Sequence, residues 1–125
     1  MAYDTENIFA KLLRKEIPSE PIYEDENVLA FRDIAPAAPV HALVIPKGEY
    51  SSFDDFAAKA GMGVVAGFFL AVQKVATDVL GLGESGYRLI TNHGADASQT
   101  VPHFHTHILG GAPLGGLVEG DTRNR

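Results

Sequence analysis

The segment "VPHFHTHILGG" (residues 101–111) is the most informative part of this sequence. It contains three of the chain's five histidines, His103, His105 and His107, at every second position. Alternate residues of a β-strand share one face. The pattern therefore predicts a strand that presents three imidazole rings on one side and the intervening residues on the other.

The spacing of the three rings favours separate chemical roles over a shared metal ion. At a strand rise of ~3.3 Å per residue the outer two rings would lie ~13 Å apart, whereas a zinc–nitrogen bond measures ~2.0–2.1 Å. A metal site would need a ligand from elsewhere, such as His41 or His93, and we expect none. Partly buried structural histidines are a second alternative. The central residue, His105, is best placed to act as a nucleophile, because imidazole has a reference pKa of ~6.5.

Composition restricts the classes of function. The chain has 125 residues, 46% of them hydrophobic and 21% charged, which is ordinary for one soluble domain. A formal net charge of −6 argues against binding to nucleic acid or to an anionic membrane. The absence of cysteine excludes disulfides and thiolate metal sites. The N-terminus lacks the apolar core of a signal peptide, and the apolar stretch 61–72 is about half the ~20 residues of a membrane span. We expect a soluble, cytoplasmic protein.

The segments around the histidine row predict an α+β fold. A short helix is expected in residues 5–17, with Asp4 or Thr5 as its cap and Pro18 as its stop. Strands are expected at 21–24, 28–33, 40–46, 86–92 and 101–111. With one long helix between the third and fourth strands, the order is α-β-β-β-α-β-β, which indicates antiparallel neighbours with helices to one side.

The long helix, predicted over residues 62–82, indicates a second subunit. Its apolar residues fill a sector of roughly 180°, whereas a helix that covers one core needs a stripe of roughly 100°. Deep burial within one chain is one explanation, and burial against a second copy is the other. We favour a homodimer.

The histidine segment resembles the signature of the histidine-triad (HIT) family of nucleotide-binding proteins. That signature alternates three histidines with single residues and ends in two apolar residues, as "HFHTHIL" (103–109) does, although Thr106 replaces a residue that is usually apolar. The preceding "SQTV" (98–101) matches the family's loop. Residues 7–47 and the "LGG" at 109–111 are similar to the Hint branch. The resemblance covers about residues 5–111 and leaves 112–125 as a tail that lacks a tryptophan found in some Hint proteins.

This resemblance implies a fold and an activity. The fold would be a single HIT domain over residues 1–125 with a five-stranded antiparallel sheet that continues across a homodimer. The activity would be hydrolysis of the P–N bond of purine nucleoside 5′-phosphoramidates, such as adenosine 5′-phosphoramidate or AMP-lysine. The ligands would be AMP or GMP derivatives, with no cofactor and no metal.

The resemblance also implies site residues. His105 would be the nucleophile that forms a nucleotidyl-histidine, His107 would support the phosphate, and His103 and His41 would belong to the supporting network. The implied nucleotide-binding residues are Asp33 at the ribose; Asn92, Ser98, Thr100 and Val101 on the phosphate side; and Ile8, Phe9, Leu12, Phe31 and Ile34 around the base. A leaving amine would take its proton through His103 or a water.

Several alternatives stay open at this point. The protein could be a dinucleoside polyphosphate hydrolase, the sister branch, against which "LGG" and residues 7–47 argue. It could be a non-catalytic nucleotide-binding scaffold dimer, against which the presence of His105 argues. Single residues also have structural alternatives: Asp33 as a turn residue, His41 as a hydrogen-bonded core histidine, and Phe9 and Phe31 as core.

Overall fold

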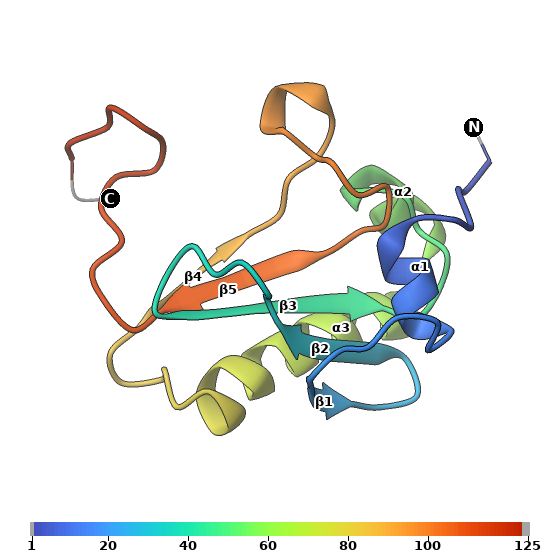
Figure 1. Ribbon diagram of the computed structural model, residues 1–125, viewed down its shortest axis with the longest axis horizontal. Helices are drawn as coiled ribbons and strands as arrows, with labels where there is room; N and C mark the ends of the chain where they lie inside the picture. The colour runs from blue at the N-terminus through green and yellow to red at the C-terminus, as the bar shows by residue number, and fades with distance from the viewer. Residues whose placement is uncertain (1, 124–125) are drawn as a thin grey trace.

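The protein forms a five-stranded antiparallel sheet with its helices on two faces (Figure 1), and the computed structural model describes residues 2–123. The strand order is β1-β2-β3-β5-β4. The strands are β1 (Pro21–Glu24), β2 (Val28–Arg32), β3 (Val40–Pro46), β4 (Tyr87–Ile90) and β5 (Thr106–Gly110). The helices are α1 (Ile8–Leu13), α2 (Phe53–Lys59), α3 (Met62–Lys74), the π-helical η1 (Val75–Val79) and the 3₁₀-helical η2 (Ala95–Ala97). The predicted α+β class and five-stranded sheet are confirmed.

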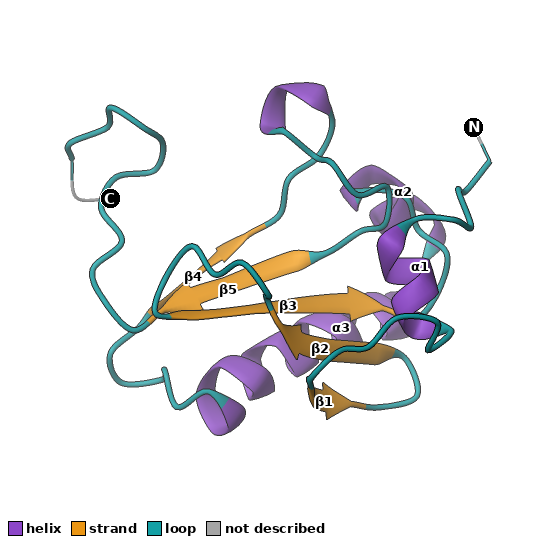
Figure 2. Cartoon of the chain, viewed as in Figure 1, coloured by secondary structure: helices purple, strands orange, loops and turns teal. Residues whose placement is uncertain are grey.

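Alternation along the strands builds two separate cores. In β2, Val28 and Ala30 belong to the core that contains α3 residues, whereas Leu29 and Phe31 pack in the core of α1. Figure 2 shows α3 lying along one face of the sheet. The opposite face carries α1 and, on the two central strands, His41 of β3 and His107 of β5.

The two central strands bring together segments that are far apart in sequence. β3 pairs with β5 so that Leu43 lies opposite His107 and His41 lies opposite Leu109. Because both strands are flanked by neighbours, the side chains that they present are held at the most rigid part of the sheet.

The fifth strand begins later than predicted. β5 starts at Thr106, so His103 and His105 precede it and only His107 lies within it. The reason lies in the backbone bonds: Pro102 has no N–H, His103 N–H donates to Val101 O, and Phe104 N–H donates to Tyr50 O instead of to a neighbouring strand.

The "LGG" that ends this strand has a steric reason. A Cβ on Gly110 would lie 2.9 Å from a methyl of Leu82, and Gly111 has a φ of +90°, which side chains rarely adopt. Both glycines therefore meet packing or backbone demands at the turn from β5 into the tail.

The helix boundaries also differ from prediction. The cap of α1 is Asn7 and not Asp4 or Thr5: its Oδ1 accepts from the N–H groups of Phe9 and Ala10, both at 2.9 Å. Helix α2 was not predicted, although the Ser52 side chain caps it by accepting from Asp55 N–H. A helix of one or two turns lacks the sustained apolar period on which the prediction depends.

The long helix ends three residues early, at Val79, and its last turn is π-helical, with Leu80 N–H donating to Val75 O at 2.8 Å. Residues Met62–Val79 are long and apolar enough to cross a membrane by length and composition alone, and 28% of them are buried. The buried ones, such as Phe68 and Val72, fill the core against the sheet and account for much of the apolar sector. Phe69, a member of that sector, is 40% exposed, and next to it Met62 is 90% and Leu70 68% exposed.

Candidate active site

His105 has one ring nitrogen held and one free. Its Nδ1 lies 2.7 Å from the carbonyl oxygen of His103. A carbonyl only accepts hydrogen bonds, so Nδ1 carries the proton and Nε2 keeps its lone pair. The ring is 8% exposed, and the Phe9 ring packs edge-on against it with centroids 5.0 Å apart. Burial lowers the pKa of His105 below its ordinary value of 6.5, so the ring is neutral at neutral pH.

His103 is a fully buried support and not a proton relay to a leaving group. Its Nε2 donates to Pro46 O at 2.8 Å, and its Nδ1 accepts from the Tyr3 hydroxyl at 2.5 Å. Burial lowers the pKa of His103 to about 4. With no exposed surface and both nitrogens engaged, the ring has no free nitrogen for a proton transfer, so the expected relay through His103 does not fit its geometry.

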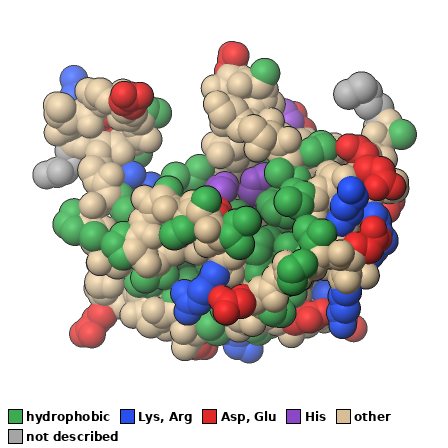
Figure 3. Space-filling view, viewed as in Figure 1, with side chains coloured by type: hydrophobic (Ala, Val, Ile, Leu, Met, Phe, Trp, Pro, Cys, Tyr) green, Lys and Arg blue, Asp and Glu red, His purple; other side chains and the backbone are tan. Residues whose placement is uncertain are grey.

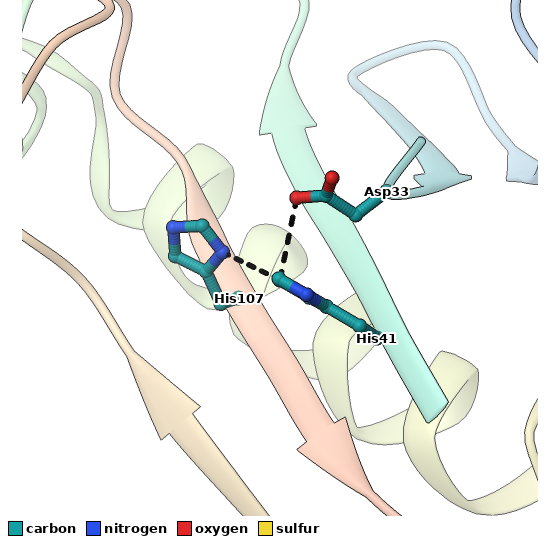
Figure 4. Close-up of side chains that lie close together, drawn as sticks. All are labelled: Asp33, His41 and His107. Atoms are coloured by element: carbon teal, nitrogen blue, oxygen red, sulfur yellow. Dashed lines mark hydrogen bonds and ion pairs between the residues drawn. The ribbon is translucent and has the colours of Figure 1, made fainter. Parts of the chain in front are cut away.

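His41 and His107 belong to a chain of hydrogen bonds that starts at the backbone N–H of Ala37. Figure 4 shows the part of the chain that joins His41 to His107 and to Asp33. Ala37 N–H donates to His41 Nδ1 at 3.0 Å, so the His41 proton resides on Nε2. His41 Nε2 lies 2.9 Å from His107 Nδ1 and 3.4 Å from an oxygen of Asp33. His107 Nδ1 therefore accepts, and the proton of the neutral His107 ring is on Nε2. Burial, with smaller contributions from His105 and His41, lowers the pKa of His107 to about 4.

The same three side chains are a possible cation site. Asp33, His41 and His107 each offer a ligand atom, and these atoms lie within 4.8 Å of one another. However, metal binding through His41 Nε2 would move its proton to Nδ1, where it would oppose the N–H of Ala37. These hydrogen bonds favour a proton on His41 Nε2, donated to His107 Nδ1, over a bound cation. His93, the other ligand considered above, lies 3.6 Å from Asp54 instead.

A cavity of about 530 Å³ opens on the α1 face of the sheet. None of the four histidines lines it, but two of its lining residues contact them: Phe9 packs against His105, and Asp33 lies 3.4 Å from His41. Its apolar lining residues are mainly those that the resemblance implied: Ile8, Phe9, Leu12, Phe31, Ile34 and Val101, together with Ile17 and Leu43. Asp33 lines it too. One Asp33 oxygen accepts from Ala35 N–H at 2.8 Å, so the residue both holds a turn and presents a carboxylate to the cavity. Figure 3 shows histidine atoms at the centre of this face among hydrophobic side chains. The size suits a nucleotide-sized ligand.

The loop expected on the phosphate side projects above the sheet. Ser98 and Thr100 are exposed and Asn92 is half-buried, but none of the three lines the cavity. The carboxamide of Gln99 holds the loop, because it accepts from Gly94 N–H at 3.0 Å and donates to Ser51 O at 2.8 Å and Val101 O at 3.1 Å. Within the described residues, the N–H groups of Thr100 and Val101 donate no backbone hydrogen bond, so they are free to meet an anion.

Three supporting residues were not predicted: Tyr3, Thr91 and Gln99. Thr91 Oγ1 donates to His105 O at 2.8 Å and lies 2.8 Å from the hydroxyl of Thr106. The unusual threonine in the triad thus faces away from the cavity and is paired. Gln99 stands within the "SQTV" motif, which was a usable signal, whereas no local pattern distinguishes Tyr3 or Thr91.

These features define a small α+β protein in which a histidine with one free ring nitrogen, His105, directly precedes the central strand β5 near an apolar cavity. A model of the HIT domain matches residues 14–114. The purine nucleoside phosphoramidase of Escherichia coli (strain K12) is 42% identical over 113 residues, which cover 90% of this chain and 93% of that protein.

Solved structures agree with this relationship. A histidine triad protein from Clostridium difficile superimposes with a TM-score of 0.82 at 40% identity, covering 92% of this chain and 98% of that one. A HIT family hydrolase from Legionella pneumophila gives a TM-score of 0.80 at 39% identity, covering 86% and 95%. The chain belongs to the HIT family, and it is a hydrolase of that family.

Proposed function

We propose that the protein hydrolyses the P–N bond of purine nucleoside 5′-phosphoramidates through a nucleotidyl intermediate on His105. The observation that carries the proposal is the free Nε2 lone pair of His105, since Nδ1 is held by the His103 carbonyl at 2.7 Å. The cavity supports it with an apolar wall for a base and the Asp33 carboxylate for ribose hydroxyls. The similarity to the E. coli phosphoramidase supports the choice of substrate class.

In the first step, His105 Nε2 attacks the α-phosphorus and the P–N bond to the amine breaks. The electron pair goes to the amine nitrogen, which takes a proton from water. The bond to phosphorus makes the imidazole cationic, and the His103 carbonyl stabilises that charge because it accepts the Nδ1 proton throughout. The Nε2–H of His107 and the N–H groups of Thr100 and Val101 stabilise the phosphoryl oxygens.

In the second step, water attacks the phosphorus of the nucleotidyl-histidine. The P–N bond to His105 breaks, its electron pair returns to Nε2, and the water releases one proton to solvent. That proton balances the one taken up by the amine. The products are a nucleoside monophosphate and the free amine, and His105 regains its starting tautomer.

We also propose that the protein acts as a homodimer. Support comes from the exposed apolar side of α3 and from β4, a strand at the edge of the sheet with Leu89 44% exposed. An unpaired edge strand next to an apolar helix face is suited to pairing with a second copy.

The test compares the chelator-treated protein with two variants on adenosine 5′-phosphoramidate and diadenosine polyphosphates. We expect the parent to retain its activity after chelation and to prefer the phosphoramidate. His105→Ala should lose activity by at least about 10³-fold, because the covalent route is lost. His93→Ala, which removes an exposed ring paired with Asp54, is the matched control and should keep full activity.

Each opposite result contradicts a distinct part of the proposal. Loss of turnover on chelation would contradict the metal-free mechanism. A preference for the dinucleotide would place the chain in the sister branch. Equal turnover by His105→Ala and the parent would contradict the nucleophile assignment. Nucleotide binding without any turnover by the parent would favour a scaffold.

A further inference from the structure

One side chain outside the cavity contacts the histidine row from the far end of the sequence. The Tyr3 hydroxyl lies 2.5 Å from Nδ1 of His103, a residue 100 positions later. The two rings also meet edge-on, with centroids 5.7 Å apart and planes at 74°. Tyr3 is half-buried, does not line the cavity, and has no part in the mechanism above.

The direction of this hydrogen bond follows from the other side of the His103 ring. Nε2 faces the carbonyl of Pro46 at 2.8 Å and must carry the proton. Nδ1 is therefore an acceptor, and the tyrosine hydroxyl donates to it. Since the His103 ring is fully buried, no water can replace that donor without opening the site.

The His103 ring in turn fixes the group that orients the nucleophile. Its own carbonyl oxygen accepts the Nδ1 proton of His105 at 2.7 Å. Phe9 contacts both rings, with centroids 6.3 Å from His103 and 5.0 Å from His105. Because the ring is anchored at both nitrogens, by Tyr3 and by the Pro46 carbonyl, it restrains the whole His103 residue, including the backbone carbonyl that accepts from His105.

We propose that Tyr3 is a positioning residue for the nucleophile, acting through the ring of His103. The expected fall in kcat rests on the proposed function. The expected change in the hydrogen bonds of His103 and His105 does not. The N-terminal segment that carries Tyr3 thus becomes part of the active-site architecture, although it precedes every predicted site residue.

The test is Tyr3→Phe, which keeps the ring contact and removes only the hydroxyl. Tyr23→Phe is the matched control. Tyr23 lies on strand β1, away from the site, and its hydroxyl also donates a hydrogen bond, to Asp25 at 2.9 Å. Both variants and the parent are labelled with ¹⁵N, and the histidine ring nitrogens are followed by long-range ¹H–¹⁵N correlation. Steady-state kinetics with adenosine 5′-phosphoramidate and thermal melts accompany the spectra.

In Tyr3→Phe we expect the Nδ1 resonance of His103 to shift towards that of an unbonded nitrogen and the signals of His105 to move with it. We expect kcat to fall roughly 3- to 10-fold with KM changed less than about 2-fold, because orientation and not binding is lost. Tyr23→Phe should leave both the histidine spectrum and kcat unchanged, whatever its melting temperature.

Three results would overturn the proposal. The first is an unchanged histidine spectrum in Tyr3→Phe. The second is a fall in kcat without movement of the His103 and His105 signals, because the effect would then bypass these rings. The third is an equal fall in kcat in both variants, which would indicate general destabilisation. If the parent shows no phosphoramidase activity, the proposed function fails, while the spectra still test the link from Tyr3 to His105.

Discussion

At the scale of single residues, the backbone sets the proton positions of the active-site histidines. The carbonyl of His103 fixes His105, the carbonyl of Pro46 fixes His103, and the N–H of Ala37 fixes His41. Backbone groups do not titrate, so these tautomers hold at every pH at which the rings are neutral. The Nε2 lone pair of His105, the proposed nucleophile, is thus in place without a ligand.

The pH dependence of activity follows from the His105 ring. Burial lowers its pKa, so Nε2 keeps its lone pair below the ordinary imidazole value of 6.5. Because only the neutral ring attacks, kcat/KM should stay level as the pH falls past 6.5 and then decrease about 10-fold per pH unit below the lowered pKa. The measurement is kcat/KM on adenosine 5′-phosphoramidate from about pH 5 to about pH 8. An acid limb centred at or above the ordinary value would contradict the buried environment of His105.

The sequence predicted which residues lie together around the cavity better than it predicted what each residue does. Ile8, Phe9, Leu12, Phe31 and Asp33 do line one cavity, as the resemblance implied. The separation of the histidine functions was predicted from strand geometry. The burial of His103 and its bond to Tyr3 were not, since the two residues lie 100 positions apart and no local periodicity connects them.

At the scale of elements, the stability of the short helix α1 affects the position of a side chain that packs against His105. It supplies Phe9, whose ring packs against His105, and its first turn is held by the buried side chain of Asn7. The helix has six residues, too few to be stable by itself. Its position therefore depends on this cap and on its packing.

We predict that Asn7→Ala lowers the free energy of unfolding by about 1–2 kcal/mol and also lowers kcat, because the first turn of α1 loosens beneath Phe9. Ser52→Ala, which removes the cap of α2, should cost about 1 kcal/mol without an effect on kcat. Urea denaturation and kinetics on the folded proteins check both. Equal kcat in the two variants would show that the position of α1 does not affect the nucleophile.

Element boundaries were predicted less well than element types. Strand β3 was found with its bounds intact, because an apolar run between turn signals is distinctive. The start of β5 was misplaced because alternation of side chains continues through residues 103–105, whereas the ladder does not. Alternation reports which way side chains point, and only the backbone partners define a strand.

At the scale of the whole molecule, the exposed side of α3 is an apolar surface that no other described residue covers, with Met62 90% and Leu70 68% exposed. We predict that the parent is a dimer and that Leu70→Glu converts it to a monomer, because a charge would enter the buried interface. Ala58→Glu, which adds the same charge at an exposed position of α2 and away from the α3 face, is the matched control. Sedimentation equilibrium over a range of concentrations provides the measurement. A monomeric parent, or a dimer unaffected by Leu70→Glu, would contradict the prediction.

The pairing of β3 with β5 has a consequence for how the chain is made. As synthesis proceeds from the N-terminus, strands β1 to β3 emerge first, and β3 then has one open edge that only residues 106–110 can cover. Until that last strand leaves the ribosome, apolar strands remain available to other nascent chains. A message truncated before codon 106 therefore yields an aggregation-prone fragment rather than a weakened hydrolase.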